Sequence, residues 1–112
     1  MHTLSTPELQ RMRKLNNELE IINVLDHQKF EAGHIPDTDN VPLEDAGFEQ
    51  EVVQMTGGKG KPVVVYCASE DCTASPQAAE RLEKAGFTDV YDYAGGTKAW
   101  HEAGLPIEGN HK

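Results

Sequence analysis

Two cysteines, Cys67 and Cys72, stand five residues apart, and Cys67 directly follows the apolar run Val63 to Tyr66. An unbroken β-branched and aromatic run is typical of a strand that is buried on both faces of a parallel sheet. After the cysteines, Ser75 and Pro76 favour the start of a helix, because serine caps helices well and proline fits the first turn. The sequence therefore predicts a strand, a cysteine, a polar loop and a helix.

A loop of this kind points backbone N–H groups toward the positive end of the helix dipole, so it can hold an anion. A cysteine at its edge would be stabilised as the thiolate, which is the nucleophilic form. We therefore interpret Cys67 as the candidate nucleophile, the alternative being a buried structural cysteine. The candidate loop comprises Cys67, Ala68, Ser69, Glu70, Asp71, Cys72, Thr73, Ala74 and Ser75.

The number of cysteines and the net charge argue against several classes of protein. Two cysteines close together are too few for a stapling framework, and they cannot form a zinc site alone, so neither a metal nor another cofactor is expected. The formal net charge of −9 at pH 7 argues against nucleic acid and anionic membranes as partners.

The 112 residues fit one compact domain, residues 1–112, with 108–112 as a flexible tail. No apolar run approaches the roughly 18 residues of a membrane helix, and the first residues do not resemble a signal peptide. We therefore expect a cytoplasmic protein.

Strands and helices are expected to alternate along the chain. This alternation predicts an α/β fold in which a parallel central sheet carries helices on both faces. Ligands then bind at the carboxyl ends of the strands, where Asp26, Cys67 and the Gly95-Gly96 turn should meet. The expected strands cover 20–26, 41–43, 63–66 and 89–93, and the expected helices cover 6–15, 27–32, 44–55, 75–85 and 97–103.

A series of short motifs resembles the rhodanese domain, of the single-domain sulfurtransferase type, over nearly the whole chain. Each motif is weak alone, but their order and spacing together are specific. They are Val24-Leu25-Asp26, Phe30 with Gly33-His34-Ile35-Pro36, Asn40 to Leu43, Val64 to Cys67, Gly95-Gly96, Ala99-Trp100 and Gly104-Leu105-Pro106.

The resemblance implies a sulfurtransferase or sulfur carrier. Cys67 would take a sulfane sulfur from a donor, hold it as a persulfide and pass it to a thiol, cyanide or a protein acceptor. Four residues are expected to support the site: Asp26 as a buried acceptor that anchors loop backbone, His34 as a brace, and Gly95 and Gly96 as a point of close backbone approach. The oligomeric state stays open.

The candidate loop departs from the family pattern because it is about two residues longer and acidic. Glu70 and Asp71 stand at positions that are basic in the family, so dianionic thiosulfate is expected to be a poor donor. The length from Cys67 to Ser75 also suits the related phosphatases. The loop contains no arginine to clamp an oxyanion, however, and this makes a phosphatase-like enzyme the less favoured alternative.

Cys72 could approach Cys67 and resolve a persulfide or a sulfenic acid into a disulfide. Closure requires a Cα separation below about 7 Å. The alternatives are a small residue tolerated in the loop, and a non-catalytic or redox-sensing binding domain that uses the Cys67-Cys72 pair.

Overall fold

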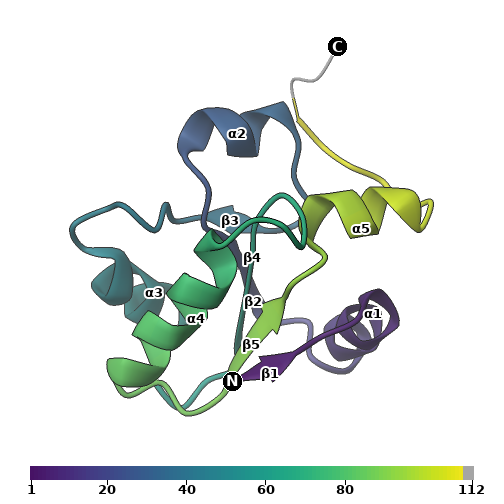
Figure 1. Cartoon of the computed structure of the whole chain (residues 1–112). Helices are drawn as coiled ribbons and strands as arrows, with labels where there is room; N and C mark the ends of the chain where they lie inside the picture. Colours follow the sequence, from purple (N-terminus) through teal and green to yellow (C-terminus); the bar gives the residue numbers. More distant parts are fainter. Residues whose placement is uncertain (110–112) are drawn as a thin grey trace.

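The computed structural model describes residues 1–109 and contains a five-stranded sheet in the order β1-β5-β4-β2-β3 (Figure 1). Every pair of neighbouring strands is parallel, which confirms the predicted α/β class. The strands are β1 (His2–Thr3), β2 (Glu20–Asn23), β3 (Asp39–Asn40), β4 (Val63–Tyr66) and β5 (Val90–Tyr93). The helices are α1 (Thr6–Leu15), α2 (His27–Ala32), α3 (Phe48–Thr56), α4 (Ala74–Lys84) and α5 (Gly96–Glu102).

Helices cover both faces of the sheet, as Figure 1 shows, and β4 carries the side chains that hold them there. Val63 and Val65 pack into a cluster with α3 and α4, whereas Val64 and Tyr66 pack into a second cluster with α1 and α5. All four side chains are fully buried. Because each buried valine contributes about 2 kcal/mol, this strand is a main source of the fold's stability.

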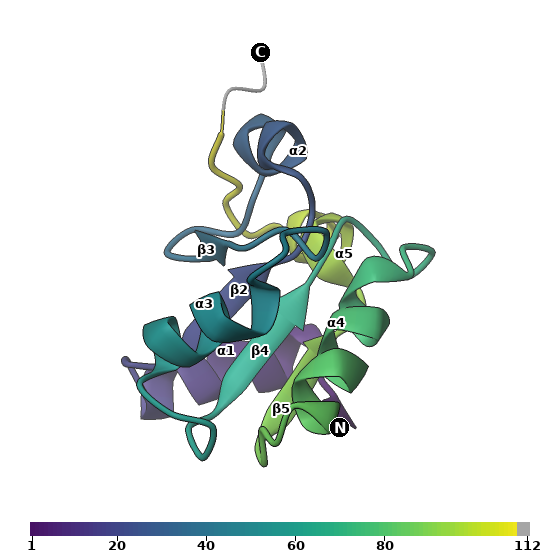
Figure 2. The ribbon, with the colours of Figure 1, turned by 90° about the vertical axis from the view of Figure 1, so that its left-hand side faces the viewer.

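The carboxyl end of β4 points toward α2 and α5 (Figure 2). From there the chain turns back into α4, whose apolar residues Ala78, Ala79 and Leu82 lie against the sheet. At the other end of α4, Gly86 has a φ of 105° and its N–H donates to the Glu83 carbonyl oxygen at 3.0 Å, which is the geometry of a glycine C-terminal cap.

The predicted N-cap of α4 was misplaced. Helix α4 begins at Ala74 with Thr73 as its N-cap, so Ser75 lies inside the first turn with its side chain buried. Helix α1 begins at Thr6, as predicted, and has Ser5 as its N-cap. Its capping box consists of a bond from the Glu8 N–H to the Ser5 hydroxyl at 3.3 Å and a bond from the Ser5 N–H to the Glu8 carboxylate at 2.8 Å.

Several other element predictions were wrong at their boundaries, and one strand was missed. The strand expected over 20–26 ends at Asn23. The third strand is Asp39–Asn40, ahead of the expected 41–43, and α3 begins at Phe48 rather than at residue 44. Strand β1 was not expected at all, because two polar or aromatic residues carry no periodic signal. It exists because His2 and Thr3 pair with Tyr91 and Asp92 of the exposed edge of β5.

The segment after α5 returns to the domain instead of fraying. The Trp100 indole N–H donates to the Pro106 carbonyl oxygen at 3.0 Å. Glu108 and His34 then form an antiparallel bridge, with N–H to carbonyl distances of 2.8 and 2.9 Å. The predicted tail was therefore wrong at Glu108, while its last residues, 110–112, lie outside the described part of the chain. Within residues 1–109, no helix combines the length and apolar character needed to cross a membrane.

The half-buried carboxyl of Glu20 predicts a pH-dependent stability. Burial, helped by the neighbouring Asp39, raises the pKa of Glu20 from 4.5 to about 7. The folded protein therefore holds a proton that the unfolded chain releases, so the free energy of unfolding should fall as the pH rises from about 4.5 to about 7. Urea unfolding across this range should show the decline, and Glu20→Gln should make it shallower. The exposed variant Glu44→Gln is the matched control, and an equal slope in wild type and Glu20→Gln would contradict the prediction.

Candidate active site

Cys67 directly follows β4, at the carboxyl end of a central strand. Its side chain is only 1% exposed and belongs to the cluster beneath α3 and α4. The loop between β4 and α4 therefore starts from a residue held firmly in the core.

The N-terminus of α5 holds the first two residues of this loop. The Thr97 N–H donates to the Cys67 carbonyl oxygen at 3.0 Å, and the Lys98 N–H donates to the Ala68 carbonyl oxygen at 2.9 Å. Gly96 makes this approach possible, since it has a φ of 63° and a Cβ atom there would collide with the Cys67 carbonyl group. The Gly95-Gly96 turn thus lies directly against the loop.

The second half of the loop folds back over the first. The Cys72 N–H donates to the Ser69 carbonyl oxygen at 3.0 Å, which closes a turn through Glu70 and Asp71. This turn brings Cys72 to Cys67, with a Cα separation of 6.4 Å, and the two residues form a disulfide. The separation lies within the limit of about 7 Å that a disulfide requires.

Most N–H groups of the loop remain available to a ligand. Among residues 68–73, only Cys72 donates its backbone N–H to another protein group within residues 1–109. The remaining N–H groups lie between a strand end and the N-terminus of α4, where the helix dipole favours negative charge. The exposed carboxylates of Glu70 and Asp71 oppose that preference.

Helix α4 does contain an arginine, but it is used elsewhere. The Arg81 guanidinium donates to both carboxylate oxygens of Glu49, at 2.8 and 3.1 Å, and to the Leu43 carbonyl oxygen at 2.9 Å. These contacts tie α4 to α3. Arg81 is therefore not placed to clamp an oxyanion in the loop.

Asp26 does not have the buried position that the sequence suggested. Its side chain is 56% exposed, and its carboxylate caps α2 by accepting the Lys29 N–H at 2.9 Å. The turn after β2 is anchored instead by Asn40, whose amide donates to the carbonyl oxygens of Asn23 and Leu25 at 3.0 and 2.8 Å. An amide can satisfy two carbonyl groups without bringing a charge into this half-buried position, which explains why an asparagine anchors the turn.

His34 is engaged on several sides. Its Nδ1–H donates to the Phe30 carbonyl oxygen at 2.8 Å, and its ring stacks on the Phe30 ring at 3.9 Å. Its backbone pairs with Glu108, as described above. These contacts join α2 to the segment that follows α5.

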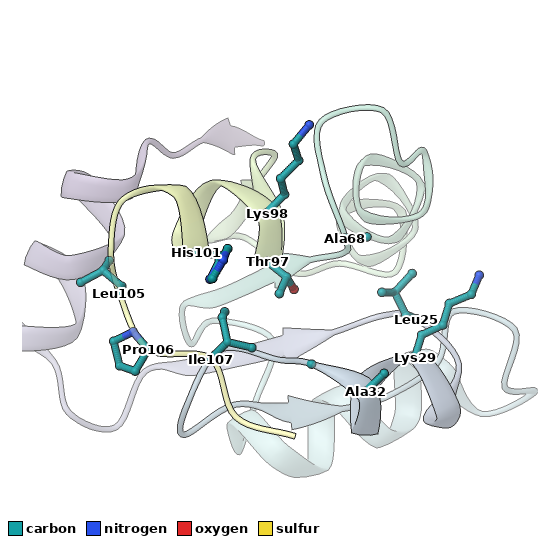
Figure 3. Close-up of a pocket in the computed structure, with 11 residues that line it drawn as sticks. Leu25, Lys29, Ala32, Ala68, Thr97, Lys98, His101, Leu105, Pro106 and Ile107 are labelled. Atoms are coloured by element: carbon teal, nitrogen blue, oxygen red, sulfur yellow. The ribbon is translucent and has the colours of Figure 1, made fainter. Parts of the chain in front are cut away.

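A pocket of about 690 Å³ lies beside the loop and was not foreseen from the sequence (Figure 3). Its walls are mainly apolar, from α2, α5, Ala68 and the segment 105–107, and His101 lies among them. Lys29 and Lys98 add positive charge, and no acidic side chain lines the pocket within residues 1–109. The apolar Leu105-Pro106-Ile107 run was the available sequence signal.

The match to a known family covers residues 5–103, which fit the family model of the rhodanese-like domain. The chain belongs to the rhodanese-like family. No group of three or more His, Cys, Asp or Glu side chains within residues 1–109 is arranged to hold a metal ion.

Relatives of this rhodanese-like domain differ in length and description. The chain is 33% identical over 100 residues to thiosulfate sulfurtransferase GlpE of Shewanella oneidensis, covering 89% of this chain and 92% of that protein. It is 30% identical over 105 residues to an HTH-type transcriptional regulator of Mycobacterium tuberculosis, covering 94% of this chain but only 44% of the regulator. The chain thus spans less than half of that relative.

A solved structure shares the fold. A thiosulfate sulfurtransferase from Pseudomonas aeruginosa superposes with a TM-score of 0.82, covering 98% of this chain and 20% of that one. The two are 23% identical, so the comparison supports the fold of this rhodanese-like domain and not its substrate.

A buried carboxyl lies on β5, next to the strand that leads into the loop of this rhodanese-like domain. Asp92 of β5 is 3% exposed and is paired in register with Val65 of β4. Burial raises the pKa of Asp92. The Ser75 hydroxyl lies beside this carboxyl, although the two groups form no hydrogen bond of normal geometry.

The contact between Gly96 and the loop predicts a specific stability loss. Gly96→Ala should lower the free energy of unfolding by about 2–4 kcal/mol, because it adds both backbone strain and a collision with the Cys67 carbonyl. Gly104→Ala is the matched control, since Gly104 has a φ of 82° but open space around it, and it should cost only about 1 kcal/mol. Urea unfolding of both variants decides the point, and equal losses would show that the loop does not rest on α5.

Proposed function

We propose that this protein is a sulfurtransferase or sulfur carrier in which Cys67 holds a sulfane sulfur as a persulfide. The observation that carries the proposal is the position of Cys67. It lies at the end of β4, at the start of a loop whose N–H groups are largely unpartnered and lead into α4. Membership of the rhodanese-like family supports this assignment.

Sulfur uptake begins from the reduced loop, so the Cys67–Cys72 disulfide must first be opened. The Cys67 thiolate, stabilised by the loop N–H groups and the α4 dipole, then attacks the outer sulfur of a donor R–S–SH. A bond forms between the Cys67 Sγ atom and that outer sulfur, and R–S⁻ leaves. The product is a persulfide on Cys67.

In sulfur delivery, Cys67 changes from the nucleophile into the leaving group. An acceptor thiolate or cyanide attacks the outer sulfur of the persulfide, and the Cys67 thiolate leaves. The same N–H groups stabilise the thiolate before uptake and after delivery, so the site favours Cys67 both as a nucleophile and as a leaving group.

The charges around the loop favour a persulfide or polysulfide donor over thiosulfate. Glu70 and Asp71 repel a dianion, and each like charge near the site costs of order 1 kcal/mol. The neighbouring pocket offers apolar walls together with Lys29 and Lys98, which suits a donor with an apolar body and a single negative charge.

A redox-sensing role is the second candidate, and the disulfide is the observation that favours it. In that case the Cys67–Cys72 bond would be the signal itself, and a partner would distinguish the crosslinked loop from the open one. The two candidates differ in whether Cys67 takes up sulfur.

Cys67→Ser should abolish sulfur uptake. A serine hydroxyl at this position forms no persulfide, so intact-mass analysis after incubation with glutathione persulfide should show no added sulfur. Cys72→Ser is the matched control, since it removes the other thiol of the loop and should still gain about 32 Da. Sulfur uptake by Cys67→Ser at the wild-type rate would refute the proposed nucleophile.

Removing the acidic charges should improve thiosulfate as a donor. We expect Glu70→Gln/Asp71→Asn to lower the KM for thiosulfate roughly thirtyfold at low ionic strength, because two repulsive charges of about 1 kcal/mol each are lost beside the anion site. The KM for benzenethiosulfonate should change less, because this donor passes on its outer sulfur in the same way, with benzenesulfinate as the leaving group, but carries a single negative charge. Steady-state kinetics with both donors measures the difference.

The control for this charge effect is Glu18→Gln/Asp89→Asn. It also removes two carboxylates, but these residues precede β2 and β5 at the opposite end of the sheet. An equal improvement in the control, or with benzenethiosulfonate, would argue against local electrostatic exclusion.

A further inference from the structure

The two cysteines of the loop differ in their access to solvent. Cys67 is 1% exposed, whereas Cys72 is only partly buried. Cys72 also lines a separate pocket of about 230 Å³, together with residues that follow β2 and β3, and Cys67 is not among the residues that line it. In the crosslinked loop, Cys72 is therefore the cysteine that an outside thiol can approach.

The turn from Ser69 to Cys72 keeps the second thiol next to the first. Because the Cys72 N–H bonds to the Ser69 carbonyl oxygen, the loop already folds Cys72 toward Cys67, and the Cα separation is 6.4 Å. A thiol held at this range has a high effective concentration, so it competes well with an acceptor in solution.

We propose that Cys72 converts the sulfur carrier into a sulfane-sulfur reductase that releases sulfide, a step that rests on the proposed persulfide of Cys67. The Cys72 thiolate attacks the Sγ atom of Cys67, forming the Cys67–Cys72 disulfide and breaking the bond between Sγ and the outer sulfur. The outer sulfur leaves as HS⁻. Two thiol sulfurs are thereby oxidised while the sulfane sulfur is reduced by two electrons, so this step needs no other oxidant or reductant.

A dithiol reductant completes the cycle. Its thiolate attacks the Cys72 Sγ atom through the small pocket, and the Cys67 thiolate leaves. Its second thiol then attacks the resulting mixed disulfide and releases Cys72. Two features favour this direction of attack: the exposure of Cys72, and the stabilisation of a departing Cys67 thiolate at the N-terminus of α4. The net reaction uses one dithiol for each sulfide released.

The proposal can be tested in a single turnover without added reductant. The reduced, desalted protein is mixed under argon with one equivalent of glutathione persulfide, and sulfide and intact mass are measured. Wild type should release about one sulfide per chain and end two hydrogens lighter than the reduced protein. Cys72→Ser should release no sulfide above the Cys67→Ser background and should retain about 32 Da of added sulfur.

The outcomes separate this inference from the proposed function. Wild type that retains the added sulfur and releases no sulfide overturns the reductase step but leaves the sulfur carrier intact. If wild type neither gains sulfur nor forms the disulfide, and Cys72→Ser gains no sulfur, the proposed function fails as well. The wild-type result needs no variant, and Cys72→Ala serves as a second variant if Cys72→Ser does not fold.

The direction of recycling has its own readout. Oxidised wild type is treated with excess glutathione, quenched with acid and mapped by peptide mass. Glutathione should be found on Cys72, because that sulfur is the accessible one and Cys67 is the better leaving group. Glutathione found predominantly on Cys67 would overturn the proposed route of reduction.

Discussion

The site depends on the hydrogen bonds by which the N-terminus of α5 holds the start of the loop. Thr97 and Lys98 donate to the carbonyl oxygens of Cys67 and Ala68, and Gly96 leaves room for the approach. Once those carbonyl groups are fixed, Cys67 has a constant position relative to β4, and the conformational freedom of the loop is confined to the residues that follow. The Ala99-Trp100 motif belongs to the same helix, and its packing into the core with α1 and β4 keeps the N-terminus of α5 against the loop.

This division between a fixed first part and a folded-back second part explains how one short loop can form a crosslink and still leave most of its N–H groups without a protein partner. The proposed anion site would use those N–H groups, whereas the crosslink brings Cys72 to Cys67. Both arrangements use the same β4 and α4 ends, so changing between them need not disturb the sheet. The chemical state of Cys67 would then select the shape of the loop.

Much of the architecture could be predicted because it depends on periodic apolar residues. The buried run of β4, the stripe of α4 and the alternation of elements give strong local signals. The boundaries were less predictable, since Ser75 is a good cap by residue type but is used as a buried side chain beside Asp92. Strand β1 and the Glu108 pairing with His34 depend on partners distant in the sequence, which local patterns cannot reveal.

Within the site, the place of Cys67 between a strand and a helix could be predicted from the sequence, and its separation from Cys72 is short enough for the crosslink that the spacing allowed. The role of Cys67 as nucleophile stays a prediction. The sequence did not predict the exposure of Asp26, the anchoring role of Asn40 or the apolar pocket beside the loop. Each depends on how α2, α5 and the segment 105–107 meet in space. The sequence also could not predict that Cys72 is more exposed than Cys67, since this difference arises from the surrounding elements rather than from the loop sequence.

The sheet ends on both sides in strands of only two residues, β1 and β3. An edge this short offers few unpaired N–H and C=O groups to another chain, so sheet extension between molecules is disfavoured. The strands with strong β-forming sequences, β2, β4 and β5, are all shielded behind these edges. The short strands β1 and β3 thereby protect the valine-rich centre of the sheet from aggregation.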